Sequence, residues 1–179
     1  MKTKNLILCS LFAAIISVCA QISIPFPGGV PLTLQVLAIC TTGLILGAKR
    51  GVISVFIYLV LGAVGLPVFA GFKGGMAILF GPTGGYLFSF PIMAYIVGLV
   101  GEKTNSIPKI FASMLAGLIA VYIVGTLYFS YLTGNDIYTS LMACVAPFLF
   151  TDIVKIILAT VIGERIRNHK VVKQSLVVQ

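Results

Sequence analysis

The side chains best suited to chemistry are Asp152 and Lys155, which lie inside the last long apolar stretch of the sequence. Three residues apart on a helix, they share one face about one turn apart. If that stretch crosses a membrane, each charge costs roughly 2.5–3.5 kcal/mol at the helix centre. The two charges offset each other and together offer a polar ligand an acceptor and donors. They form either an internal ion pair or the polar end of a cavity, and we favour the cavity because apolar residues would avoid the cost.

Catalytic and nucleotide-binding motifs are missing elsewhere in the sequence. There is no G-x-S-x-G or H-E-x-x-H, the single histidine, His169, lies in the basic tail, and the four cysteines have no CxxC or histidine partner. Residues 81–86 (GPTGGY) lack the Walker A lysine. We therefore expect no enzyme, no metal and no cofactor. Any uphill transport would need an ion gradient or a partner that hydrolyses ATP.

Composition makes lipid the expected solvent of this chain. Its 179 residues are 59% hydrophobic and 9% charged, and the mean hydropathy is +1.14. A soluble domain is roughly a quarter charged, so this chain has too little polar surface to cover itself in water. The net charge of +8 comes from residues at the chain ends and in short connections. That distribution is typical of membrane topology signals and not of nucleic-acid binding.

The apolar runs that would position the pair predict an all-α membrane protein, a six-transmembrane-helix bundle forming one integral domain over residues 1–179. The expected helices cover residues 5–24, 31–47, 52–65, 83–101, 110–132 and 141–162. The first run also resembles a secretory signal, but we favour a retained helix because apolar residues continue to Ile24. Pro147 is expected to start or kink the sixth helix.

Basic residues predict the orientation in the cytoplasmic membrane. With six spans both termini share a side, and that side holds ten Lys and Arg residues against one, Lys73, on the other. Because positive loops stay inside, both termini are expected in the cytoplasm. The ten residues are Lys2, Lys4, Lys49, Arg50, Lys103, Lys109, Arg165, Arg167, Lys170 and Lys173.

Three connections are expected outside, around residues 25–30, 66–82 and 133–136. The first two are rich in glycine and proline and resist regular helix. They also carry aromatic residues such as Phe26, Phe69 and Phe72. Irregular backbone at membrane depth is tolerated where it is buried or lines a cavity. These segments are therefore either plain loops in water or lids over a pocket that opens outward.

Small residues on the first helix offer a surface for close helix packing. Ser10 and Ala14 are four residues apart, with Ala13 on a nearby face. Small residues at this spacing let two helices approach closely in lipid. They serve either packing within the bundle or docking of another membrane subunit.

Several ordered stretches together resemble the BioY family, the biotin-binding S components of energy-coupling factor (ECF) transporters. The resemblance covers about residues 5–162. The matching stretches are residues 24–27 (IPFP), 30–35 (VPLTLQ), 46–51 (LGAKRG), 58–69 (YLVLGAVGLPVF) and 79–86 (LFGPTGGY), with Asp152-x-x-Lys155 in the sixth run.

The resemblance implies that biotin is bound near the outer face, with Asp152 and Lys155 on its polar groups. Residues 72–75 and Tyr86 would enclose it, and residues 25–35 would act as a lid. Ser10, Ala13 and Ala14 would meet a transmembrane coupling subunit that works with two cytoplasmic ATPase subunits. The implied substrate-binding set is Asp152, Lys155, Tyr86, Phe72, Lys73, Gly84, Thr33 and Gln35.

This sequence departs from the family pattern at two places. Phe150 and Thr151 precede Asp152 where smaller residues are expected, and Lys73 is a charge where uncharged residues are expected. The alternative functions are an S component for another small vitamin, or an assembly protein or membrane enzyme. An enzyme would need a nucleophile or metal cluster, and an assembly protein would have no need of the buried pair.

Overall fold

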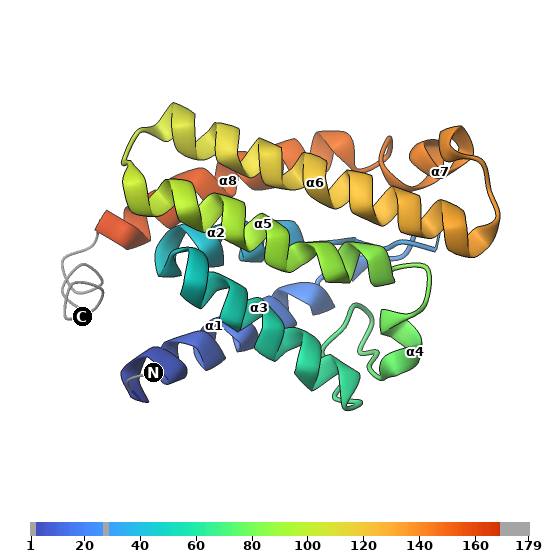
Figure 1. Cartoon of the computed structure of the whole chain (residues 1–179), viewed down its shortest axis with the longest axis horizontal. Coiled ribbons are helices and arrows are strands. Elements are labelled where there is room, and N and C mark those ends of the chain that lie inside the picture. The colour runs from blue at the N-terminus through green and yellow to red at the C-terminus, as the bar shows by residue number, and fades with distance from the viewer. Residues whose placement is uncertain (1–2, 27–28, 169–179) are drawn as a thin grey trace.

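Apolar runs of this length form helices because lipid offers no partner for backbone N–H and C=O groups. The computed structural model describes residues 3–26 and 29–168, which are mostly helical. The elements are α1 Thr3–Gln21, β1 Ser23–Ile24, β2 Leu32–Thr33, α2 Gln35–Leu46, α3 Ala48–Ala63, α4 Met76–Leu79, α5 Gly84–Lys103, α6 Ile107–Thr133, α7 Ile137–Cys144 and α8 Leu149–Asn168 (Figure 1).

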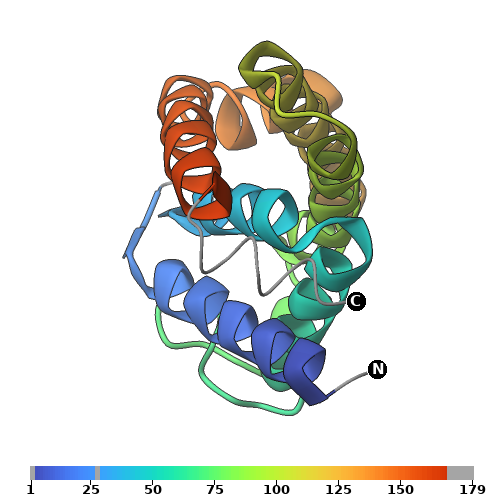
Figure 2. The ribbon, with the colours of Figure 1, turned by 90° about the vertical axis from the view of Figure 1, so that its left-hand side faces the viewer.

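Helix α2 is the centre of the bundle. Ten of its twelve residues are buried, and it contacts α1, α3, α5 and α8. Figure 2 shows α2 between α1 on one side and α5, α6 and α8 on the other. Glycines allow this close packing, because a Cβ at Gly43 would lie 2.7 Å from the carbonyl oxygen of Ala94, and one at Gly98 would clash with the backbone of Ala48.

Among the described residues, three helices are long and apolar enough to cross a membrane by themselves: α1, α5 and α6. Helices α7 and α8 qualify together as one bent span. Helix α2 has 12 residues and extends about 18 Å, short of the ~30 Å of a hydrocarbon core. The length and composition of these helices thus give three or four spans, and the sixfold count stays a prediction.

A short antiparallel ribbon replaces the helical ends predicted around residues 22–34. Ser23 pairs with Thr33 and Ile24 with Leu32. The first helix therefore ends at Gln21 and not near residue 24, since Ile24 precedes Pro25 and that position disfavours helical dihedrals. The second helix begins at Gln35 and not at 31, because Leu32 and Thr33 are paired with β1 in the ribbon.

The last predicted helix is divided into α7 and α8, which meet at an angle of 53°. Pro147 lies in the break, where its missing N–H and its ring interrupt a helix. Helix α7 starts earlier than predicted because Asp136 caps it, accepting a hydrogen bond from the amide of Thr139 at 3.1 Å.

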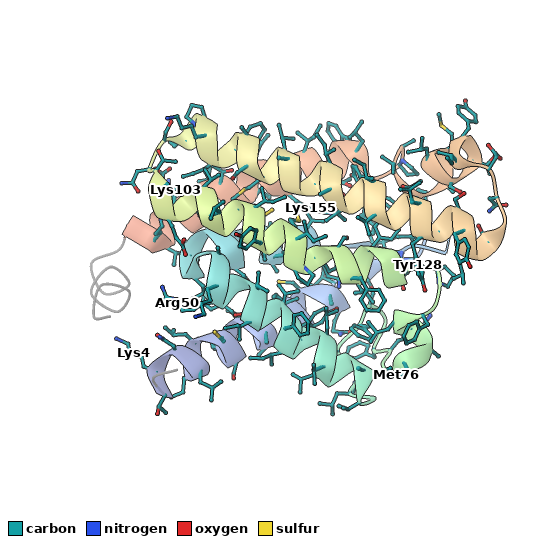
Figure 3. The ribbon with its side chains drawn as sticks, in the orientation of Figure 1. Lys4, Arg50, Met76, Lys103, Tyr128 and Lys155 are labelled. Atoms are coloured by element: carbon teal, nitrogen blue, oxygen red, sulfur yellow. The ribbon has the colours of Figure 1, made fainter. Side chains whose placement is uncertain are left out.

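The two ends of the bundle carry different residues. The start of α1, the α2–α3 and α5–α6 junctions and the end of α8 lie at the left of Figure 1. Lys4, Arg50 and Lys103 are at that end in Figure 3, which we call the basic end. The ribbon, α4 and α7 lie at the opposite end, which we call the cavity end. Predicted basic residues outside the described residues are Lys2, Lys170 and Lys173.

Candidate ligand-binding site

The predicted pair is a buried ion pair. Lys155 Nζ lies 2.6 Å from Asp152 Oδ1, and the two residues are 6% and 4% exposed. The second carboxylate oxygen, Oδ2, accepts a hydrogen bond of 2.7 Å from Tyr122 Oη on α6. The carboxylate is thus paired with an ammonium on its own helix and a phenol on a neighbouring one. These two partners offset the free-energy cost of burying its charge.

The break before α8 sets the depth of this group. Asp152 lies in the first turn of α8, and its amide donates to the carbonyl of Phe148 at 2.8 Å. A carboxylate near a helix N-terminus is stabilised by the helix dipole. The break therefore places Asp152 in the interior of the bundle, where Figure 3 shows Lys155 midway along the molecule.

A cavity of about 210 Å³ adjoins the pair. It is formed where the start of α2, the 69–73 turn, α4, α5, α6 and the α7–α8 break meet. The polar or charged residues in its lining include Thr33, Gln35, Lys73, Thr83, Tyr86, Tyr122, Asp152 and Lys155. Most other lining side chains are apolar, among them Leu87, Phe90, Val121 and Phe148, so a small amphipathic molecule suits the space.

A second polar group lies where the ribbon joins α2. The hydroxyl of Thr33 donates to Gln35 Oε1 at 2.8 Å, and Gln35 Nε2 donates to Tyr58 Oη at 2.7 Å. Tyr58, on α3, is fully buried. These hydrogen bonds fix the amide of Gln35 in one orientation at the cavity wall. Thr33 and Gln35, both predicted to contact a ligand, line the cavity.

Tyr86 is held against α6. Its ring lies against Gly125, where a Cβ would clash with it, and its hydroxyl is 3.4 Å from Thr126 Oγ1. Gly84, also predicted to contact a ligand, is not among the lining residues in the described chain. A Cβ at Gly84 would collide with the carbonyl of Leu79, so this glycine permits the tight turn that brings Tyr86 to the cavity.

Two neighbouring residues that are both predicted to contact the ligand, Phe72 and Lys73, lie differently. Lys73 lines both the cavity and a groove beside it. Phe72 is 72% exposed and is not among the lining residues of the described chain. The aromatic residue of this turn that lines the cavity is Phe69, which is fully buried with its ring centroid 5.4 Å from that of Tyr58.

The first helix presents only part of the predicted small-residue face. Ser10 and Ala14 are exposed on α1, whereas Ala13 is fully buried against the bundle. The expectation that Ala13 shares a docking surface is therefore wrong, because successive residues of a helix point about 100° apart and Ala13 falls on the inner side.

The sequence did not predict the roles of Tyr122 and Tyr58. Both stand in apolar runs and look there like ordinary bulky residues. The available signal is that a buried tyrosine usually needs a partner for its hydroxyl. Tyr122 lies in the same run as Thr126, which would have suggested a polar side of α6.

Comparison with known proteins gives the family. The sequence matches the BioY family over residues 1–171. The chain belongs to this family. It is 43% identical to the probable biotin transporter BioY of Pyrococcus horikoshii, over 94% of this chain and 99% of that one. It is 42% identical to the biotin transporter BioY of Thermotoga maritima, over 94% of this chain and 98% of that one.

The comparison of folds agrees with the comparison of sequences. A crystal structure of the S-component for biotin from an ECF-type ABC transporter superposes with a TM-score of 0.86 and 32% identity, over 94% of this chain and 93% of that one. The relatives are transporters, and three helices of spanning length occur in the described part. This BioY family member is accordingly a multi-pass protein of the cell membrane.

Proposed function

We propose that this chain binds biotin in the cavity and is the substrate-specific subunit of an ECF-type transporter. The observation that carries the proposal is the buried pair of Asp152 and Lys155, with the hydroxyl of Tyr122 on its carboxylate, beside an otherwise mostly apolar cavity. Membership of the BioY family makes biotin the first ligand to test.

The ion pair has unused hydrogen-bonding capacity for the ureido ring of biotin. An ammonium has three donors and each carboxylate oxygen two acceptor sites. Within the described residues, Lys155 Nζ has one acceptor, Asp152 Oδ1. Lys155 can therefore donate to the ureido carbonyl while Asp152 accepts from a ureido N–H, and the ion pair need not break.

The rest of the cavity matches the other parts of biotin. Phe90, Val121 and Phe148 offer apolar walls for the thioether ring and the aliphatic chain. Lys73 stands where the cavity meets the outer groove, and its ammonium is the partner we assign to the carboxylate. Thr33, Gln35 and Tyr86 line the intervening wall.

The membrane arrangement we propose has six spans in a single domain over residues 1–179 and both termini in the cytoplasm. Lys4, Arg50 and Lys103 gather at one end in Figure 3, and cytoplasmic loops are the positive ones. The partners are a transmembrane coupling subunit, which would contact Ser10 and Ala14, and two cytoplasmic ATPase subunits. A reporter fused at Gln179 that reads extracytoplasmic would overturn this orientation.

The decisive experiment is equilibrium binding of radiolabelled biotin to the purified full chain in detergent. Asp152→Asn and Lys155→Ala should each weaken binding at least about tenfold, because each leaves a buried polar partner unmatched. Val154→Ala, an exposed position on the same helix, is the matched control and should bind normally. Unchanged affinity in both site variants would remove the pair from the site.

A further inference from the structure

Gln21, the last residue of α1, joins that helix to a turn far away in the sequence. Its Nε2 group donates to the carbonyls of Phe69 at 3.1 Å and Pro67 at 3.3 Å. Its Oε1 atom accepts from the amide of Phe72 at 2.8 Å. The same Nε2 group also donates to the carbonyl of Ser17 on α1 at 3.2 Å. One side chain thus connects α1 to both arms of the 67–72 turn.

The turn that Gln21 holds forms part of the cavity lining, and we call residues 67–73 the cavity roof. Phe69 and Lys73 exchange two backbone hydrogen bonds, 2.9 and 3.3 Å long, which close the turn. Phe69, Ala70 and Lys73 line the cavity. A shift of the turn by an ångström or two would therefore move the lining itself.

The turn also contains a strained residue. Phe72 has φ +57°, the left-handed region that an L-residue with a Cβ rarely adopts. Its side chain is 72% exposed, so packing does not hold it there. Such a conformation persists only where surroundings impose it. The hydrogen bond from the Phe72 amide to Gln21 acts here together with the two backbone hydrogen bonds between Phe69 and Lys73.

The other edge of the cavity mouth also begins at the end of α1. The lining of the groove beside the cavity, which we call the mouth, includes two sets of residues that we call its edges: Ser23, Pro25 and Phe26, and then Ala70, Gly71 and Lys73. The first edge follows α1 directly in the chain, and the second is tied to α1 through Gln21. Both edges of the mouth are thereby attached to one helix terminus.

We propose that Gln21 is a positioning residue that couples α1 to the 67–73 turn, so that the place of α1 sets how tightly the mouth is closed. This inference rests on the proposed function for its ligand, biotin. Displacement of α1 pulls on the turn through Gln21. Loss of the Gln21 hydrogen bonds lets Phe72 leave its strained conformation and loosens the roof.

The test is Gln21→Ala in the full chain in detergent, with two measurements. Amide hydrogen exchange of residues 67–75, measured without ligand, should become faster. Radiolabelled biotin should dissociate about five- to tenfold faster, the size expected for losing one or two hydrogen bonds. Association should be unchanged or faster, because an open mouth admits ligand as well as releasing it. A fold that was merely damaged would instead lower the fraction of protein able to bind.

Ser17→Ala is the matched control, since the Ser17 hydroxyl donates only to the carbonyl of Ala13 on the same helix. A second variant, Phe72→Gly, removes the strain, so Gln21→Ala made in that background should change exchange and release less than it does alone. If Gln21→Ala exchanges and releases ligand as Ser17→Ala does, the coupling is wrong. If the unmodified protein binds no biotin, the proposed function fails, and the exchange measurement still decides the role of Gln21.

Discussion

The basic end and the cavity end hold their backbones in different ways. At the basic end α2 and α3 are joined by Gly47 alone, and Glu102 Oε1 accepts from the amide of Ala48 at 2.9 Å. Arg167 there donates to the carbonyl of Gly101 at 2.7 Å and to Asn105 Oδ1 at 2.6 Å. Helices at this end are in backbone contact and their termini are tied to one another.

At the cavity end, single side chains join backbone hydrogen bonds in tying irregular segments to the helices. Gln21 holds the 67–72 turn, and Tyr128 Oη donates to the carbonyl of Phe80 at 3.1 Å beside the turn into α5. Segments with few restraints open at lower free energy than packed helices. The difference suggests that the basic end keeps the helices in register while the cavity end admits a ligand.

The largest expected effect is at the basic end. Gly98→Leu should prevent stable folding, because a side chain there clashes with the backbone of Ala48 and neither helix can yield. The measurement is the yield of monodisperse protein by size exclusion and its thermal unfolding midpoint. Ala116→Leu, an exposed position on α6, should behave normally. Normal behaviour of the Gly98 variant would mean that the basic end is as adaptable as the cavity end.

The next effect is on affinity alone. Tyr122→Phe removes the hydrogen bond to Asp152 Oδ2 and leaves the packing unchanged. Biotin binding should weaken about tenfold, as expected for a bond to a charged group, while the thermal midpoint of the free protein shifts little. Tyr131→Phe, at an exposed residue of the same helix, is the control. An equal loss in both variants would argue against the tyrosine as a support of the carboxylate.

A smaller effect is expected at the mouth. Lys73→Met should slow biotin association about two- to fivefold at low salt, because the ammonium attracts a carboxylate only over a short screened distance. The difference from the unmodified protein should shrink as salt is added, as followed by association rates at several ionic strengths. Lys109→Met, at the basic end, should leave these rates alone. A salt-independent loss would point to packing and not to charge.

The smallest effect is a local dependence on pH at α7. Hydrogen bonds from Thr139 lower the pKa of Asp136 from its usual value. A lowered folded-state pKa means that the stabilisation is present above the unfolded value, near pH 4, and is lost as pH falls through the lower folded value. Exchange of the first amides of α7 should therefore show a small added opening below about pH 4. In Asp136→Asn, a neutral cap, that dependence should disappear.

Lipid energetics explain what the sequence could predict. Asp152 and Lys155 stand out because charge inside an apolar run is expensive, and glycine- and proline-rich stretches predict irregular segments. Tyr122 does not stand out, since its role depends on which face of α6 meets α8. The same uncertainty placed Ala13 with Ser10 and Ala14, because helical spacing predicts which residues share a face and not which face is inward.

Short irregular elements could not be predicted from the sequence for a related reason. The β1–β2 ribbon has two residues in each strand, too few for an alternating pattern. Phe69 and Phe72 look equivalent in a glycine-rich stretch. The path of the turn buries Phe69 and exposes Phe72, and the turn is hydrogen-bonded to Gln21, 48 and 51 residues away.

The shortness of α2 has a consequence for the volume of the site. A helix that crossed the full hydrocarbon thickness would need about eight residues more than its twelve. Gln35, at its first position, already borders the cavity. The hollow thus occupies the space of roughly two missing helical turns, so a ligand there would take the place of side chains that a longer helix would have supplied. Lengthening α2 at that end would fill the hollow with protein. The residue at which α2 begins therefore limits the size of the ligand that the cavity can hold.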